Sequence, residues 1–213
     1  MLQFITNADN ASDIVGQVKD VIAGGCRWVQ LRMKNASKEE IMPVAEQLKK
    51  ICADSECILI IDDHVDIAKE LALDGVHLGK TDMNPAEARA ILGANPIIGV
   101  TANTFADIEA YSSLDVDYVG LGPFRYTTTK KNLSPILGID GYKAIMQQCA
   151  ENGIYLPVVA IGGIGYADIQ AVMNTGVHGV AVSGSLINAE STVEATRAMI
   201  DLLSTIVERR KNI

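Results

Sequence analysis

Segment 120–131 of this 213-residue chain contains the residue types that suit a phosphate site. It runs from an apolar stretch, Gly-Leu-Gly-Pro-Phe, through Arg-Tyr into three threonines and two lysines. Threonine hydroxyls and loop N–H groups are short, directional donors, and lysine supplies compact positive charge for phosphate oxygens. A solvated basic turn is the alternative interpretation, so the choice depends on what the rest of the chain brings to this segment.

A second set of cationic groups ends the second apolar run of the chain. Gln30, Arg32 and Lys34 occupy alternate positions, and the period of two in a strand sends all three side chains to one side. The intervening Leu31 and Met33 face the other side. Arginine can bind phosphate oxygens bidentately and lysine can neutralise them, so a phosphate ester or diphosphate is the expected occupant. A surface edge of alternating polar and apolar residues is the alternative.

Three aspartates follow the next two apolar runs. Asp62 and Asp63 end the third run and Asp82 follows the fourth, so Asp63 and Asp82 close adjacent strands. Mg²⁺ takes one or two carboxylates together with waters and substrate phosphate, which suits a diphosphate held by the neighbouring cationic strand. We therefore expect Asp63 and Asp82 to bind Mg²⁺, with helix capping or a salt bridge as the alternative.

Glycines follow the last two apolar runs, in segments 160–164 and 182–185. Glycine lets backbone N–H groups approach a phosphate closely, although it also permits tight turns. The three histidines stand at no recognisable spacing from a serine or cysteine nucleophile, so Ser-His and Cys-His catalysis are not expected. We expect His77 to be a hydrogen-bonded core residue and His178 a loop residue.

The elements that position these groups can be read from eight short β-rich runs. They cover 2–6, 28–33, 58–62, 75–78, 97–102, 118–122, 157–161 and 179–183. Between them lie amphipathic stretches with apolar residues three and four apart, which predicts alternating strands and helices. Strands that are apolar nearly throughout are typical of parallel sheets covered by helices. We predict an α/β fold, a (β/α)8 TIM barrel forming a single domain over residues 1–213, whose polar strand ends meet at one mouth.

Composition excludes several other classes of protein. A net charge of −8 argues against nucleic acid or an anionic membrane as a partner, although a local basic pocket remains compatible with it. No run is long enough to span a membrane and the N-terminus lacks the pattern of a signal peptide, so a cytoplasmic location is expected. The sequence leaves the oligomeric state open, a homo-oligomer included. We interpret the four cysteines as reduced, buried residues: Cys26, Cys52, Cys57 and Cys149.

Six segments, in order along the chain, resemble the thiamine-phosphate synthase family, also called thiamine-phosphate pyrophosphorylase. They are 30–34, 62–68, 74–82, 99–101, 127–130 and 160–164. The resemblance implies a Mg²⁺-assisted enzyme that joins 4-amino-5-hydroxymethyl-2-methylpyrimidine diphosphate to a thiazole phosphate, or its carboxylated form, and releases pyrophosphate. Both substrates would be phosphorylated small molecules.

The resemblance also assigns residues. The pyrimidine diphosphate would be held by Gln30, Arg32, Lys34, Asp62, Thr101 and Lys130. The thiazole phosphate would be held by Thr127, Thr128, Thr129, Gly163, Ser183 and Gly184. Asp63 and Asp82 would bind Mg²⁺, and the departing charge would be neutralised by the catalytic residues Arg32, Lys34 and Lys130.

The chain departs from the family pattern at four positions. Met33 replaces a glutamate on the side that should face away from the substrates, and Thr101 replaces a serine while keeping the hydroxyl. Asp62 stands where asparagine is usual and brings an extra negative charge near the diphosphate. Lys80 stands where glutamine is common and could partner Asp62 or Asp82.

Two other functions are compatible with such a barrel. The related thiazole tautomerase branch needs a histidine to move a proton, and segment 101–130, where that histidine is expected, contains none. A regulatory barrel that binds thiamine precursors without turnover is the other alternative, and Asp62 is the feature that favours it.

Overall fold

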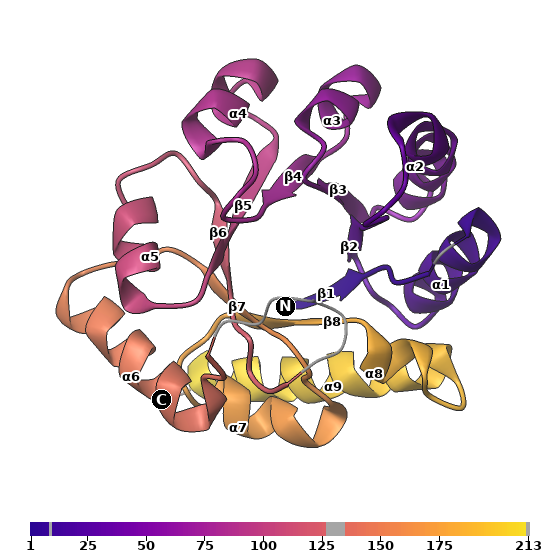
Figure 1. Ribbon diagram of the computed structural model, residues 1–213. Coiled ribbons are helices and arrows are strands. Elements are labelled where there is room, and N and C mark those ends of the chain that lie inside the picture. The colour runs from indigo at the N-terminus through magenta and orange to yellow at the C-terminus, as the bar shows by residue number, and fades with distance from the viewer. Residues whose placement is uncertain (9, 127–134, 212–213) are drawn as a thin grey trace.

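Eight parallel strands, each paired with the next and β8 paired with β1, close a barrel in the computed structural model of the chain, which describes residues 1–8, 10–126 and 135–211 (Figure 1). The strands are β1 (Leu2–Ile5), β2 (Trp28–Leu31), β3 (Ile58–Asp62), β4 (Gly75–Leu78), β5 (Ile97–Ala102), β6 (Tyr118–Leu121), β7 (Val158–Ile161) and β8 (Gly179–Val182). Each lies within two residues of its predicted bounds. The predicted single-domain (β/α)8 TIM barrel is therefore confirmed.

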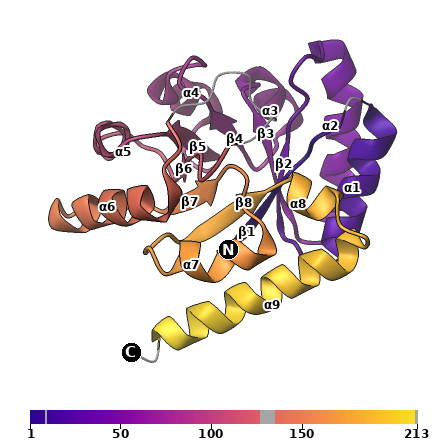
Figure 2. The same cartoon turned by 60° about the horizontal axis from the view of Figure 1, so that its bottom comes forward.

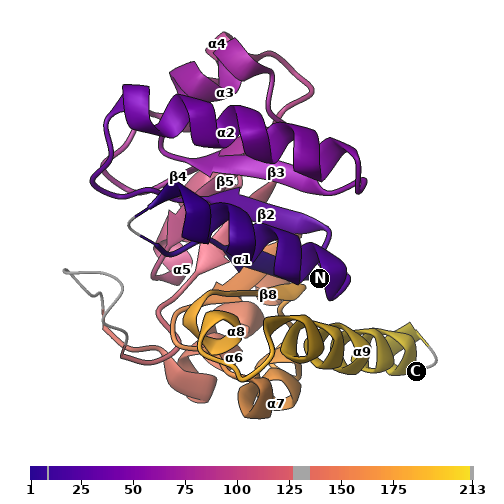
Figure 3. The ribbon, with the colours of Figure 1, turned by 90° about the vertical axis from the view of Figure 1, so that its right-hand side faces the viewer.

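Helices surround this barrel on its outside (Figure 1). They are α1 (Ala11–Ala23), α2 (Lys38–Ala53), α3 (Val65–Leu71), α4 (Pro85–Leu92), α5 (Phe105–Tyr111), α6 (Gly138–Glu151), α7 (Ile169–Met173), α8 (Gly184–Ile187) and α9 (Thr192–Lys211). A short 3₁₀ turn, Tyr166–Asp168, precedes α7. Helices α1 and α2 lie side by side along one flank (Figure 3), and α9 packs against α1 and α7 (Figure 2).

Local sequence explains where the helices begin. Ser37 caps α2 by accepting from the backbone N–H of Glu40, whose carboxylate in turn accepts from the N–H of Ser37, which is a capping box. Asn10 caps α1 by accepting from the backbone N–H of Asp13. The chain leaves α1 through Gly24.

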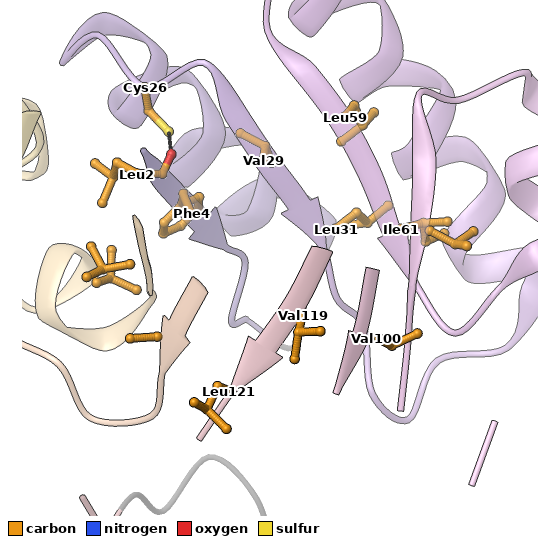
Figure 4. Close-up of a cluster of buried hydrophobic side chains, with 14 of the residues drawn as sticks. Leu2, Phe4, Cys26, Val29, Leu31, Leu59, Ile61, Val100, Val119 and Leu121 are labelled. Atoms are coloured by element: carbon orange, nitrogen blue, oxygen red, sulfur yellow. Dashed lines mark hydrogen bonds between the residues drawn. The ribbon is translucent and has the colours of Figure 1, made fainter. Parts of the chain in front are cut away.

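Side chains alternate across each strand, so the barrel has two apolar layers. Outward-facing residues such as Phe4, Leu31 and Ile61 join the larger cluster between strands and helices (Figure 4). The inner cluster consists of Ile5, Trp28, Ile60, Tyr118, Val159 and Ala181. The barrel interior is therefore packed, and ligands have access from the mouth.

Two glycines make room for aromatic rings inside the barrel. A Cβ on Gly99 would lie 2.1 Å from Cε1 of Tyr118, and a Cβ on Gly120 would lie 3.0 Å from Cε1 of His77. Real Cβ atoms essentially never approach as closely as the first distance and rarely as closely as the second, so the ring of Tyr118 requires glycine at 99 and the ring of His77 leaves little space at 120.

The four cysteines are free and buried, as predicted. In the part of the chain that the structure describes, no helix combines the length and the apolar character needed to cross a membrane.

Candidate active site

Asp62 is the centre of a polar cluster at the carboxyl ends of β2 and β3. Nε2 of Gln30 donates to Oδ1 of Asp62 at 2.9 Å, and Nε of Arg32 pairs with Oδ2 of Asp62 at 3.1 Å. The side chains of Arg32 and Asp62 are only 11% and 19% exposed, so this ion pair is poorly screened by water. The extra charge expected from Asp62 is therefore compensated by Arg32 within the protein.

Thr6, just beyond β1, fixes the backbone that carries Arg32. Its Oγ1 accepts from the N–H of Arg32 at 2.8 Å and lies 3.2 Å from the Arg32 carbonyl oxygen, to which it donates. Its own N–H donates to the carbonyl of Gln30 at 3.0 Å. Thr6 therefore fixes the backbone of both Gln30 and Arg32 at the end of β2. It was not among the predicted site residues.

Lys34 lies beside the aspartates. It is exposed, and it lines a small cavity of about 30 Å³ together with Met33, Asp62, Asp63 and His64. Because the side chain is exposed, anions in solution have access to its ammonium group. Met33 also packs against the outer apolar cluster.

Asp63 and Asp82 are brought together as predicted. Partial burial, the interaction with the neighbouring carboxyl group of Asp82 and the charge of Asp62 raise the pKa of Asp63 to about 8. Two carboxylates in contact become stable as anions only when a cation lies between them, so this pair fits a hard divalent ion.

The backbone around Asp63 is unusual and well supported. Its φ of 65° lies in the left-handed region, which aspartate tolerates better than most residues. Its N–H donates to the carbonyl of His77 at 2.9 Å, and the N–H of His64 donates to the carbonyl of Asp62 at 2.8 Å. The described residues contain no group of three or more His, Cys, Asp and Glu suited to a metal, so water and substrate oxygens would complete the shell of a bound ion.

A tight turn orients Asp82. Its Oδ2 accepts from the N–H of Gly79 at 2.5 Å, and its own N–H donates to the Gly79 carbonyl. The expectation for Lys80 was wrong: its Nζ pairs with Oδ2 of Asp107 at 2.7 Å instead of with Asp62 or Asp82. Asp107 lies at the start of α5, where the backbone N–H groups of Asn103 and Thr104 donate to its carboxylate and hold it within reach of Lys80.

Thr101, at the end of β5, lies on the next part of the mouth. Its Oγ1 is 2.9 Å from Nε2 of His77, whose Nδ1 is 2.8 Å from the hydroxyl of Tyr118. Nε2 of Gln3 donates to the same hydroxyl at 3.0 Å. His77 is thus a hydrogen-bonded core residue, as predicted, whereas Tyr118 and Gln3 were missed; a glutamine within the otherwise apolar β1 was the available signal.

The loop after β7 packs directly on the start of the loop after β6. Gly163 has a φ of 74°, and a Cβ there would lie 2.5 Å from Cγ of Arg125. The N–H of Arg125 donates to the carbonyl of Gly162 at 3.0 Å, and Nη2 of Arg125 pairs with Asp168 at 2.6 Å. Glycine is therefore required at 163 both for its conformation and for the close approach of the two loops.

Ser183 and Gly184 follow β8, the strand next to β7. The Oγ atoms of Ser183 and Ser185 are buried and have no hydrogen-bond partner among the described residues. Since buried hydroxyls are nearly always satisfied, an oxygen-rich ligand is a reasonable partner for these two. The structure places Gly163 and Ser183 on neighbouring strand ends, as the phosphate prediction requires.

Four predicted residues, Thr127, Thr128, Thr129 and Lys130, lie outside the described residues. The described ends of their loop are tied together, because the N–H of Leu137 donates to the carbonyl of Pro123 and that of Gly138 to the carbonyl of Phe124, each at 3.0 Å.

Several known proteins are similar to this chain. Residues 2–186 match the family model described as thiamine monophosphate synthase. The thiamine-phosphate synthase of Bacteroides fragilis is 53% identical over 201 residues, which cover 94% of this chain and 98% of that protein. That of Flavobacterium johnsoniae is 45% identical over 189 residues, 89% of each. The structure of thiamine phosphate pyrophosphorylase from Pyrococcus furiosus has a TM-score of 0.84 at 28% identity, covering 97% of this chain and 96% of that one.

Proposed function

The chain belongs to the thiamine-phosphate synthase family, and from this premise we propose that the mouth of its barrel is divided into a diphosphate half and a thiazole phosphate half. The protein is an enzyme of thiamine biosynthesis that couples the pyrimidine and thiazole phosphates. The diphosphate half is formed by the ends of β2 to β5, and the thiazole phosphate half by the loops after β6, β7 and β8.

In the diphosphate half, the cationic groups bind the pyrimidine diphosphate. Arg32 and Lys34 contact its phosphate oxygens, Gln30 and Thr101 provide hydrogen bonds, and Lys130 approaches from the loop after β6. The contacts of Asp62 support a separate role for this residue: Asp62 orients the side chains of Arg32 and Gln30, and these two side chains contact the substrate.

Asp63 and Asp82 hold Mg²⁺ in this proposal. The raised pKa of Asp63 beside Asp82 supports this assignment, because a bound divalent ion would stabilise the charged form of the carboxylate. When bound, the ion neutralises charge that develops on the departing diphosphate.

The reaction exchanges one bond for another at the pyrimidine methylene carbon. The C–O bond to diphosphate breaks, the diphosphate leaves with the electron pair, and the thiazole nitrogen forms the new C–N bond. The aminopyrimidine ring stabilises the benzylic-type cation in this dissociative substitution, so no protein nucleophile is needed. Arg32, Lys34 and Lys130 stabilise the leaving group, and catalysis consists of ionisation and positioning.

In the thiazole phosphate half, Gly163, Ser183 and Gly184 bind the phosphate together with the hydroxyls of Thr127, Thr128 and Thr129. The buried, unpartnered Oγ of Ser183 supports this assignment. The buried thiols fit the reducing cytoplasm in which we propose that the reaction takes place.

The observation that carries the proposal is the convergence of the Arg32–Asp62 pair and the Asp63–Asp82 pair at one barrel mouth. A coupled assay of pyrophosphate release tests it, with both substrates, with each one omitted, and with and without Mg²⁺. Release should require both substrates and the metal. Binding without release at saturating substrates would favour a regulatory barrel, and release from the pyrimidine diphosphate alone would indicate a hydrolase.

A further inference from the structure

Four side chains from four strands form a continuous hydrogen-bonded chain from the barrel interior to its mouth. It starts at Gln3 of β1, passes through Tyr118 of β6 and His77 of β4, and ends at Thr101 of β5. The three contacts are 3.0, 2.8 and 2.9 Å long. Gln3 and Tyr118 are almost inaccessible to solvent, at 2% and 3% exposure, so each polar atom there needs a partner within the protein.

The direction of donation along this chain follows from the chemistry of its first members. Gln3 uses an amide N–H and therefore donates to the Tyr118 oxygen. Burial raises the pKa of Tyr118 well above its ordinary value, so the phenol keeps its proton and must donate it. Nδ1 of His77, 2.8 Å away, is the acceptor that this geometry offers.

An imidazole that accepts at Nδ1 carries its proton on Nε2. Nε2 of His77 therefore donates to Oγ1 of Thr101. Among the described residues, His77 is the one polar side chain that contacts this hydroxyl. Because the oxygen of Thr101 already accepts, its own proton is available for an acceptor at the barrel mouth.

We infer that Tyr118 and His77 are positioning residues that fix the Thr101 hydroxyl as a hydrogen-bond donor toward the diphosphate substrate. The inference rests on the proposed function for the identity of the acceptor, whereas the direction of the chain rests on its contacts and on the burial of the Tyr118 phenol. A donor with a set orientation favours a phosphate oxygen over a group that itself must donate, such as an ammonium or an amide N–H.

The surroundings of the chain keep its rings in place. Gly99 and Gly120 leave the space that the rings of Tyr118 and His77 occupy, as described above. Trp28, the single tryptophan of the protein, packs edge-on against Tyr118 with ring centroids 4.8 Å apart. The hydroxyl of Tyr118 can thus be removed by Tyr118→Phe with little change in packing, and Trp28 fluorescence reports whether the interior stays intact.

The first test needs no substrate. Nitrogen-15 NMR of the full-length protein distinguishes protonated from unprotonated ring nitrogens, and His77→Asn identifies the His77 signals among the three histidines. We expect Nδ1 to be unprotonated and Nε2 protonated, with this preference lost in Tyr118→Phe. The opposite tautomer, or a doubly protonated ring, would overturn the assigned direction whatever reaction the enzyme performs.

The second test is a double-mutant cycle on kcat/KM for the pyrimidine diphosphate. Thr101→Val removes the hydroxyl and should lower kcat/KM by about tenfold or more, as expected for one hydrogen bond to a charged group. Thr101→Ser keeps a hydroxyl and should recover most of this loss. Tyr118→Phe should lower kcat/KM by about three- to tenfold in the native background and have no further effect in Thr101→Val. Equal losses in both backgrounds would show that Tyr118 acts on stability alone.

These tests separate two kinds of failure. If the native protein releases no pyrophosphate, the proposed function fails while the tautomer experiment still decides the direction of the chain. If turnover is normal but the tautomer is wrong, only the role of Tyr118 and His77 fails. Trp28 emission and the melting temperature of Tyr118→Phe show whether a kinetic loss arises from a damaged fold.

Discussion

Replacing Asp62 separates two roles that its carboxylate can play beside a diphosphate. If Asp62 positions Arg32 and Gln30, its removal weakens catalysis. If its charge instead repels the diphosphate, its removal tightens binding. The structure favours positioning, because both oxygens of Asp62 are engaged, at 2.9 Å by Gln30 and at 3.1 Å by Arg32.

The expected size of the effect follows from these two contacts. Asp62→Ala removes the carboxylate that accepts from Gln30 and pairs with Arg32, and it leaves the guanidinium of Arg32, 11% exposed, without this counter-ion. A cost of about 2–4 kcal/mol in the free energy of unfolding is expected, below the full cost for a wholly buried pair because both groups keep some contact with water. For a domain of this size the melting temperature should fall by about 5–10 °C.

The kinetic effect should be larger for alanine than for asparagine. Loss of orientation at Arg32 should lower kcat/KM for the pyrimidine diphosphate by about 100-fold in Asp62→Ala. In Asp62→Asn the amide oxygen can still accept from Arg32. Once the side-chain amide of Gln30 flips, the new amide N–H can donate to the Gln30 oxygen. The kcat/KM of Asp62→Asn should therefore fall by no more than about tenfold.

Pyrophosphate-release kinetics and thermal unfolding measure both quantities. Asp66→Asn is the matched control, since Asp66, on nearby α3, forms an exposed ion pair with Lys38 of α2. The substitution should cost less than about 1 kcal/mol and leave the kinetics unchanged. A lower KM in Asp62→Asn, or native kcat/KM in Asp62→Ala, would refute the positioning role.

Three further predictions concern other parts of the molecule. Asp82→Asn should lose Mg²⁺-dependent turnover while the exposed Glu87→Gln on α4 keeps it, and equal activity in both variants would exclude Asp82 as a ligand. Ser183→Ala should raise the KM for the thiazole phosphate by about three- to tenfold and leave the KM for the pyrimidine diphosphate unchanged. If only the KM for the pyrimidine diphosphate rose, the assignment of the two halves would be reversed. Burial, followed by the charge of Arg210, lowers the pKa of His178 from its ordinary 6.5, so its contribution to stability is complete above that pH and declines as the pH falls below it. His178→Asn should therefore lose less stability than the native protein between about pH 7 and about pH 5 in thermal unfolding, and identical pH dependence would contradict this.

The barrel could be predicted because its signals are local. Each strand shows as a short β-rich run, and the cap at Ser37 is set by residues three positions apart. Strand ends in a parallel barrel share one mouth, so the meeting of Asp63 and Asp82 also followed from the order of the elements.

The pairing within the mouth could not be predicted, because it depends on long-range geometry. Asp62 meets Gln30 across 32 positions of sequence, and Gln3 meets Tyr118 across 115. Nothing local in the sequence of a strand shows which inward residue of another strand lies opposite in the barrel. The same reason accounts for Lys80, which lies in the loop after β4 and whose actual partner, Asp107, lies on α5.

The most direct test of the proposed site is a crystal structure of the protein with pyrophosphate, thiamine phosphate and Mn²⁺ in place of Mg²⁺. We predict an anomalous-scattering peak within coordination distance of Asp63 and Asp82, pyrophosphate in contact with Arg32 and Lys34, and the phosphate of the product beside Ser183. A peak elsewhere, or the two phosphate groups bound in the opposite halves of the mouth, would contradict the proposed division of the site.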